Sequence, residues 1–157
     1  MDAGRRAVLK SGGGVTLLAL VGAAGWLEPG DASAQSWNKA AFDTRSLPDA
    51  MQALGGGEPV RSGDIVFFQT PDIAENGAVV PIGITSSIPR TESIAILIEK
   101  NPNMLAAVFD LPAGTEPSVT TRVKMAQTSN VYALVKADGR YYVASKEIKV
   151  TLGGCGG

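Results

Sequence analysis

Hydrophobic and polar residues alternate in short runs along the chain after residue 64. In the segment 119–125, every second residue is suited to a core: Val119, Thr121, Val123 and Met125. The residues between them are Thr120, Arg122 and Lys124, so this segment is typical of a β-strand that buries one face. Runs of this kind predict seven strands, at 65–69, 79–85, 94–99, 105–111, 119–125, 131–136 and 141–152.

The connections between these runs favour a sandwich. Asn76-Gly77 and Asp138-Gly139 predict tight hairpin turns, because both residue pairs tolerate the positive φ that such turns need. Short strands with a turn about every ten residues are typical of an antiparallel β-sandwich. We therefore expect an all-β, immunoglobulin-like antiparallel β-sandwich.

The segment before the strands predicts one or two short helices that cover the sheet. Apolar residues recur there at spacings of three to five between positions 37 and 54. Ser46 is suited to cap a helix, and Pro48 fits its first turn. The run 55–57 is all glycine and predicts where that helix ends.

The first 34 residues have the parts of an export signal. Arg5-Arg6 precedes an apolar run at 15–27, and Ala32-Ser33-Ala34 is a small-x-small cleavage site. The paired arginines are similar to a twin-arginine signal, which carries folded cargo. Because the apolar run is shorter than the roughly 20 residues of a membrane span, we expect cleavage, a periplasmic location and no membrane anchor in the mature chain.

Composition excludes several classes of function. The chain has 157 residues and a formal net charge of −1, with its basic residues scattered, which argues against a nucleic-acid partner. It has no histidine, so the usual general base and the usual metal ligand are missing. No phosphate-binding glycine loop is present either, because the run 55–57 lacks the lysine that must follow it. We therefore expect a protein that is not an enzyme and has no metal or cofactor.

The sole cysteine, Cys155, stands between two pairs of glycines: Gly153, Gly154, Gly156 and Gly157. Such a segment has no preferred conformation and nothing to bury, so it predicts a flexible C-terminal arm. An odd cysteine in an exported protein indicates a bond to another molecule or a free thiol. The expected organisation is a cleaved signal at 1–34, a sandwich domain with its helical segment at 35–152, and an arm at 153–157 whose Cys155 is an attachment point.

The residues of this arm resemble a known family. The ending from Lys149 to Gly157 resembles the signature tail of SoxY, the sulfur-carrier subunit of the periplasmic Sox system for thiosulfate oxidation. Three internal stretches, 73–81, 99–102 and 121–126, add to the resemblance, which together with the export signal spans essentially the whole chain. The family often has a second proline after Asn101-Pro102, where this chain has Asn103.

The resemblance implies a carrier cycle that the chain itself does not catalyse. A haem-containing partner joins thiosulfate to the thiol of Cys155, a hydrolase releases sulfate, and, where the system has one, a sulfane dehydrogenase oxidises the remaining sulfur. The resemblance also implies a heterodimer with an immunoglobulin-like SoxZ subunit and disulfide dimers through Cys155.

Two other interpretations stay open at the level of sequence. In one, the chain is an exported structural or interaction module that uses Cys155 for an intermolecular disulfide. In the other, the terminal Gly156-Gly157 bears a thiocarboxylate, as in ubiquitin-like sulfur carriers. The export signal argues against the second, because that chemistry needs ATP.

Overall fold

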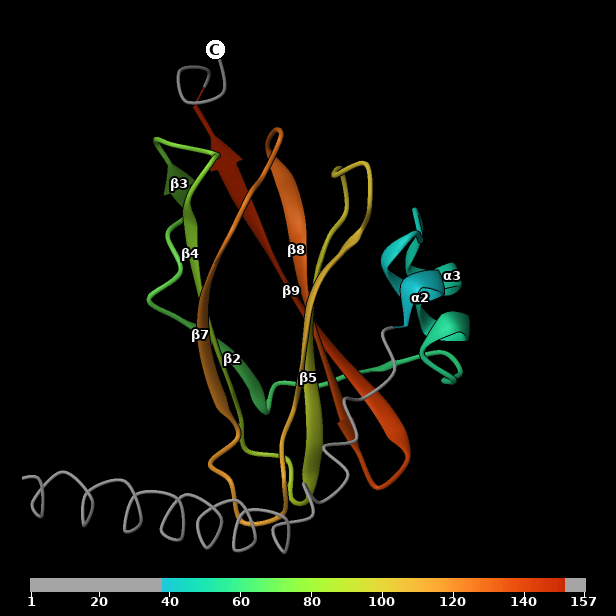
Figure 1. Cartoon of the computed structure of the whole chain (residues 1–157). Helices are drawn as coiled ribbons and strands as arrows, with labels where there is room; N and C mark the ends of the chain where they lie inside the picture. Colours follow the sequence, from blue (N-terminus) through green and yellow to red (C-terminus); the bar gives the residue numbers. More distant parts are fainter. Residues whose placement is uncertain (1–37, 152–157) are drawn as a thin grey trace, which may run out of the picture. The chain divides into compact units, whose positions relative to one another are not determined.

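The structure is a computed structural model that describes residues 38–151 (Figure 1). The elements in this range are α2 (Lys39–Phe42), α3 (Leu47–Ala53), β1 (Val60–Arg61), β2 (Ile65–Phe68), β3 (Ile73–Ala74), β4 (Val80–Ser86), β5 (Thr91–Ile98), β6 (Leu105–Asp110), β7 (Ser118–Val123), β8 (Ser129–Ala137) and β9 (Arg140–Val150). No helix in this range is long and apolar enough to cross a membrane. The predicted export signal, 1–34, and the predicted arm, 153–157, lie outside the described residues.

The strands form two sheets that face each other (Figure 1). The large sheet has the order β1-β9-β8-β5-β6, and β3 also pairs with β9; the small sheet has the order β2-β4-β7. The core between them draws aliphatic side chains from both sheets, among them Ile82, Ile84, Ile94, Ile96, Val131 and Ile148. The expected all-β sandwich is confirmed. The two short strands β1 and β3, which the sequence pattern did not predict, run parallel to β9.

The two helices cover part of the outer face of the large sheet, where a second apolar cluster includes Met51, Leu97 and Leu134. Ser46 caps α3 as expected, since its hydroxyl oxygen accepts a hydrogen bond from the Asp49 amide at 3.2 Å. Gly55 has φ +75°, which ends the helix. The helical segment is therefore confirmed as cover for the sheet.

All seven predicted strands are present, with ends that differ by a few residues. Asp138 and Gly139 have φ of 49° and 71° and join β8 to β9, so this hairpin is confirmed. The hairpin predicted at Asn76-Gly77 is wrong: β3 pairs with β9, whereas β4 pairs with β2 and β7. Neither residue has positive φ. Asn76 instead accepts a hydrogen bond from the Ala78 amide at 2.9 Å, in a turn that leads the chain from one sheet to the other.

Candidate functional site

The candidate site begins where β9 ends. Cys155 and its flanking glycines, Gly153, Gly154, Gly156 and Gly157, lie outside the described residues, which stop at Thr151. What the structure defines is the point from which the chain runs on toward Cys155. We call the end of the sandwich that contains this point the root end.

Backbone hydrogen bonds hold the last residues of β9 on one side to β3. The register pairs Ile73 with Lys149 and Ala74 with Val150 in parallel. The Thr151 amide donates to the Ala74 carbonyl at 3.1 Å, and the Thr151 hydroxyl donates to the Glu75 carbonyl at 3.3 Å. The sheet pairing of β9 therefore continues to the last described residue.

The other side of β9 is held by a threonine. The Val150 amide donates to the Thr128 hydroxyl oxygen at 3.0 Å, just before β8 begins. A threonine hydroxyl at a strand end satisfies a backbone amide that the neighbouring strand no longer reaches. Thr128 and β3 thus fix the end of β9 from both sides, so the chain leaves the domain at a defined point.

Three separate stretches meet at the root end, and they are the internal stretches that add to the resemblance of the C-terminal tail. The Met125 amide donates to the Gly77 carbonyl at 2.7 Å. The side chain of Asn101 donates to the Lys124 carbonyl at 2.7 Å and accepts from the Ala126 amide at 3.1 Å. Stretches 73–81, 99–102 and 121–126 therefore form one assembly of loops around the end of β9.

Sequence reasoning missed Asn101 and Thr128 as residues that shape this site. The Asn101 side chain bonds to backbone groups that lie 23 and 25 residues further along the chain. The Thr128 side chain bonds to a backbone amide 22 residues further along. The available signal was their residue type, because asparagine and threonine in loops often bond to nearby backbone. That signal does not identify the partner, which depends on how the loops pack.

Basic side chains at the root end differ in their pairing. Lys146 is held by Asp72 at 3.0 Å and by the Thr70 carbonyl at 2.6 Å. Within residues 38–151, Arg122 and Lys124 are exposed and form no ion pair, so both cations can meet groups of a partner.

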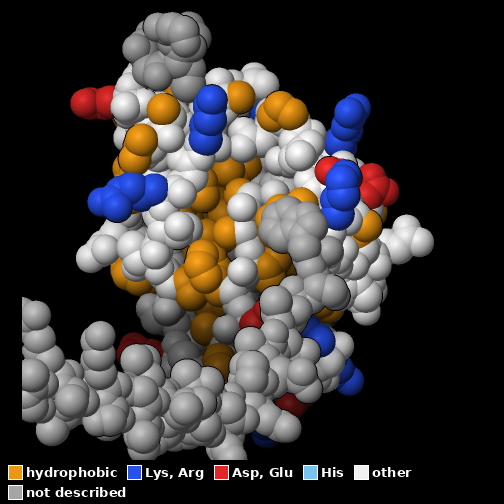
Figure 2. Space-filling model, in the orientation of Figure 1, with side chains coloured by type: hydrophobic (Ala, Val, Ile, Leu, Met, Phe, Trp, Pro, Cys, Tyr) orange, Lys and Arg blue, Asp and Glu red, His pale blue; other side chains and the backbone are white. Residues whose placement is uncertain are grey.

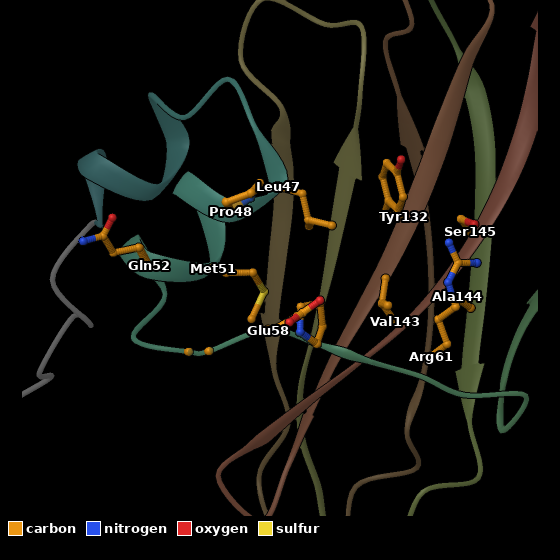
Figure 3. A pocket seen from close by; sticks show the side chains of 13 residues that line it. Leu47, Pro48, Met51, Gln52, Glu58, Arg61, Tyr132, Val143, Ala144 and Ser145 are labelled. Carbon is orange, nitrogen blue, oxygen red and sulfur yellow. The ribbon is translucent and has the colours of Figure 1, made fainter.

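A groove of about 560 Å³ lies next to α3 on the outer face of the large sheet (Figure 3). Leu47, Pro48 and Met51 form one side, and Tyr132 and Val143 come from the sheet. The sequence pattern could not reveal this groove, because its walls come from α3, β1, β8 and β9. Its lining contains no cysteine and no histidine, and its charged residues are Glu58 and Arg61.

Tyr132 lines this groove and has a raised pKa. Burial and the nearby Glu99 raise the pKa of its phenol, and the hydroxyl donates to the Glu99 carboxylate at 3.2 Å. The phenol therefore stays protonated at neutral pH and acts as a hydrogen-bond donor. Among residues 38–151, no group of three His, Cys, Asp or Glu side chains is arranged to hold a metal ion.

Comparison with known proteins finds a family match that extends over most of the chain. Residues 50–155 match the family model described as sulfur oxidation protein SoxY, a range that includes Cys155. The solved structure of the sulfur carrier protein SoxY from Chlorobium limicola f thiosulfatophilum is 39% identical, with a TM-score of 0.61. That match covers 68% of this chain and 96% of that chain.

Other comparisons add little. The superoxide reductase (neelaredoxin) from Ignicoccus hospitalis is 18% identical over 66% of this chain and 92% of that chain, with a TM-score of 0.49. A likeness at that level carries no inference about function. No protein with a curated description matches the chain significantly.

Proposed function

The chain belongs to the SoxY family of sulfur oxidation proteins, and from this membership we propose that it carries the sulfur intermediates of thiosulfate oxidation as covalent adducts on Cys155. The observation that carries the proposal is the position of Cys155. It is the only cysteine of the chain, it lies within the matched range, and it follows Thr151, which is bonded to β3, by four residues. The glycines around it form a flexible arm that passes the adduct between enzymes.

The cycle begins with an oxidation and continues with a hydrolysis. The thiol of Cys155 and thiosulfate lose two electrons and one proton to form R–S–S–SO₃⁻, and a haem-containing partner accepts the electrons. Water then attacks the terminal sulfonate, which leaves as sulfate with two protons, and R–S–S⁻ stays on the carrier. Where the system has a sulfane dehydrogenase, that enzyme oxidises the remaining sulfur.

The carrier supplies the sulfur attachment point and the enzymes supply the catalysis. The thiolate is the reactive form of cysteine, and no basic residue lies within five positions of Cys155 in the sequence. Activation of the thiol therefore comes from the enzyme that receives it. The chain itself needs no metal or cofactor for this role.

The proposal includes partners and a location. The carrier works as a heterodimer with a SoxZ-like immunoglobulin-fold subunit. When an oxidant accepts two electrons, two unoccupied Cys155 thiols lose two protons and form a disulfide dimer. Export by the twin-arginine route places the folded pair in the periplasm. Cleavage after Ala34 is expected, and N-terminal sequencing of the exported protein should begin at Gln35.

Intact-mass measurement tests the attachment. The heterodimer is incubated with thiosulfate, the haem-containing partner and an electron acceptor, and the wild-type chain should gain one thiosulfate. Cys155→Ser should gain nothing. A matched control combines Cys155→Ser with Ser145→Cys, which places a thiol on an exposed strand position. That thiol should react with a small disulfide reagent and receive no enzymatic adduct.

Two results would contradict the proposal. An enzymatic adduct on Cys155→Ser would place the attachment site elsewhere. Reversible Cys155 disulfide formation with no adduct in the wild type, while a known carrier is loaded in a parallel reaction, would favour the structural module instead.

A further inference from the structure

The reach of Cys155 limits where an enzyme can bind when it acts on this carrier. Cys155 lies four positions after Thr151, which is anchored to β3. Even fully extended, four residues span only about 14 Å. An enzyme that takes the sulfur into an active site must therefore bring the rim of that site against the root end of the domain.

One side of the root end presents apolar and basic side chains together. Val79 is 50% exposed, and it lies one residue before β4. The register pairs Pro81 of β4 with Arg122 of β7, and both side chains are exposed. Lys124, also exposed, follows the end of β7, where the Met125 amide bonds to the Gly77 carbonyl. We call this set, Val79, Pro81, Arg122 and Lys124, the root patch.

The root patch is positively charged, because Arg122 and Lys124 are its charged residues. Neither β4 nor β7 contains an aspartate or a glutamate. The nearest carboxylate along the chain is Glu75, before the turn that leads into β4. Figure 2 shows hydrophobic and basic side chains interspersed on the visible face near this end of the domain, with an acidic side chain at the margin. A surface of this kind suits a partner with apolar groups and carboxylates.

We propose that the root patch docks the enzymes that act on Cys155, and that the rims of their active sites meet it with apolar side chains and carboxylates. The inference rests on the proposed carrier function and adds the surface that the enzymes recognise. Apolar contact at Val79 and Pro81 holds the short-lived complex, while Arg122 and Lys124 speed encounter and set orientation. Docking at this place keeps Cys155 within its reach of about 14 Å.

The chain provides a matched control for Val79. Val66 is the same residue type, is 49% exposed, and lies on β2 of the same small sheet. The register pairs Val66 with Thr85, five residues along β4 from Val80, so it lies about 17 Å from the root end. Arg140, exposed at the start of β9, serves as the corresponding control for Arg122.

The test uses the heterodimer, loaded without any enzyme. Tetrathionate reacts with the thiolate of Cys155 to give R–S–S–SO₃⁻ and releases thiosulfate, so every variant can carry the same adduct. Sulfate release by the hydrolase is then measured. Val79→Asp and the double variant Arg122→Glu/Lys124→Glu should each lower kcat/KM by about tenfold or more. Val66→Asp and Arg140→Glu should stay within about twofold of the wild type.

Further measurements separate docking from other effects. The rate of loading by tetrathionate should be equal in all variants, and melting temperature and size-exclusion chromatography should show a folded heterodimer. Rising salt should lower kcat/KM of the wild type and leave that of Arg122→Glu/Lys124→Glu nearly unchanged. Val79→Ser replaces Val79→Asp if the aspartate variant does not fold.

Three outcomes would overturn the proposal that the root patch docks the enzymes. Val79→Asp could keep the wild-type kcat/KM, or Val66→Asp could lower kcat/KM as much as Val79→Asp does. The Val79 variants could also fail to assemble with the companion subunit, which would make the patch a subunit interface. A wild-type heterodimer that the hydrolase does not process at all would count against the proposed function and not against the patch.

Discussion

Different kinds of interaction stabilise the two ends of the sandwich. At the end with the β8–β9 hairpin, Arg90 pairs with Asp138, and Lys136 pairs with Glu92 at 3.2 Å. The Gly139 amide also donates to the Glu92 carboxylate at 3.1 Å. The root end also has an ion pair, between Lys146 and Asp72 at 3.0 Å. The side chains that hold its loops and the end of β9 are uncharged: Asn101, Thr128 and Thr151.

The difference is visible in the titration of the hairpin end. The hydrogen bond from Arg90 lowers the pKa of Asp138, and the hydrogen bond from the Gly139 amide lowers the pKa of Glu92. The hydrogen bond to Glu92 raises the pKa of Lys136 in turn. Arg90, Glu92, Lys136 and Asp138 at the hairpin end are thus paired with one another, whereas Arg122 and Lys124 at the root end form no ion pair within residues 38–151.

The largest effect should come from shortening the link at the root end. Deletion of Gly153 and Gly154 removes about 7 Å of reach. We expect a loss of tenfold or more in the enzymatic turnover of loaded Cys155, because even small misplacements of reacting groups are costly. Insertion of two further glycines should leave turnover within about threefold. Undiminished turnover in the shortened chain would contradict the docking geometry.

A smaller effect should separate the two ends in stability. Asn101→Ala removes two hydrogen bonds between loops of the root end and should lower the free energy of unfolding by about 1–2 kcal/mol. Arg90→Ala breaks an exposed ion pair at the hairpin end and should change stability much less. Urea denaturation of both variants measures the difference. Asn101→Asp keeps one acceptor oxygen and should fall between wild type and Asn101→Ala; equal losses in Asn101→Ala and Arg90→Ala would contradict the contrast.

The smallest effect concerns pH at the hairpin end. Because the folded state lowers the pKa of Asp138 below its ordinary value of 3.8, the pair with Arg90 adds stability above that pH and loses it as pH falls through the folded-state pKa. Asp138→Asn should therefore melt slightly below the wild type at pH 7. The difference in melting temperature should disappear as the pH falls below the folded-state pKa of Asp138. A difference that persists in acid would assign the effect to packing.

The seven long strands were predictable because their signals are local. Alternation along β7 follows from which residues face the core, and the structure buries Val123 and Met125 while Arg122 and Lys124 stay exposed. The turn at Asp138-Gly139 was predictable for the same reason, since two consecutive residues with positive φ determine it.

The short strands and the turn at Asn76-Gly77 were not predictable from local signals. β1 and β3 have two residues each, and they are strands only because their backbones pair with β9. Asn76-Gly77 has the composition of a hairpin turn, yet the strands on either side of it belong to different sheets. Tertiary pairing therefore decided the conformation of this dipeptide.

The sequence by itself determined the sandwich, its helical cover and the position of Cys155 four residues beyond Thr151, because strand period, helix caps and chain length are properties of neighbouring residues. Only the tertiary structure decided how the end of β9 is held and what surrounds it. Ala74, Asn101 and Thr128 are far apart in the chain and meet there through the packing of separate loops. Residue type alone does not encode contacts of that range.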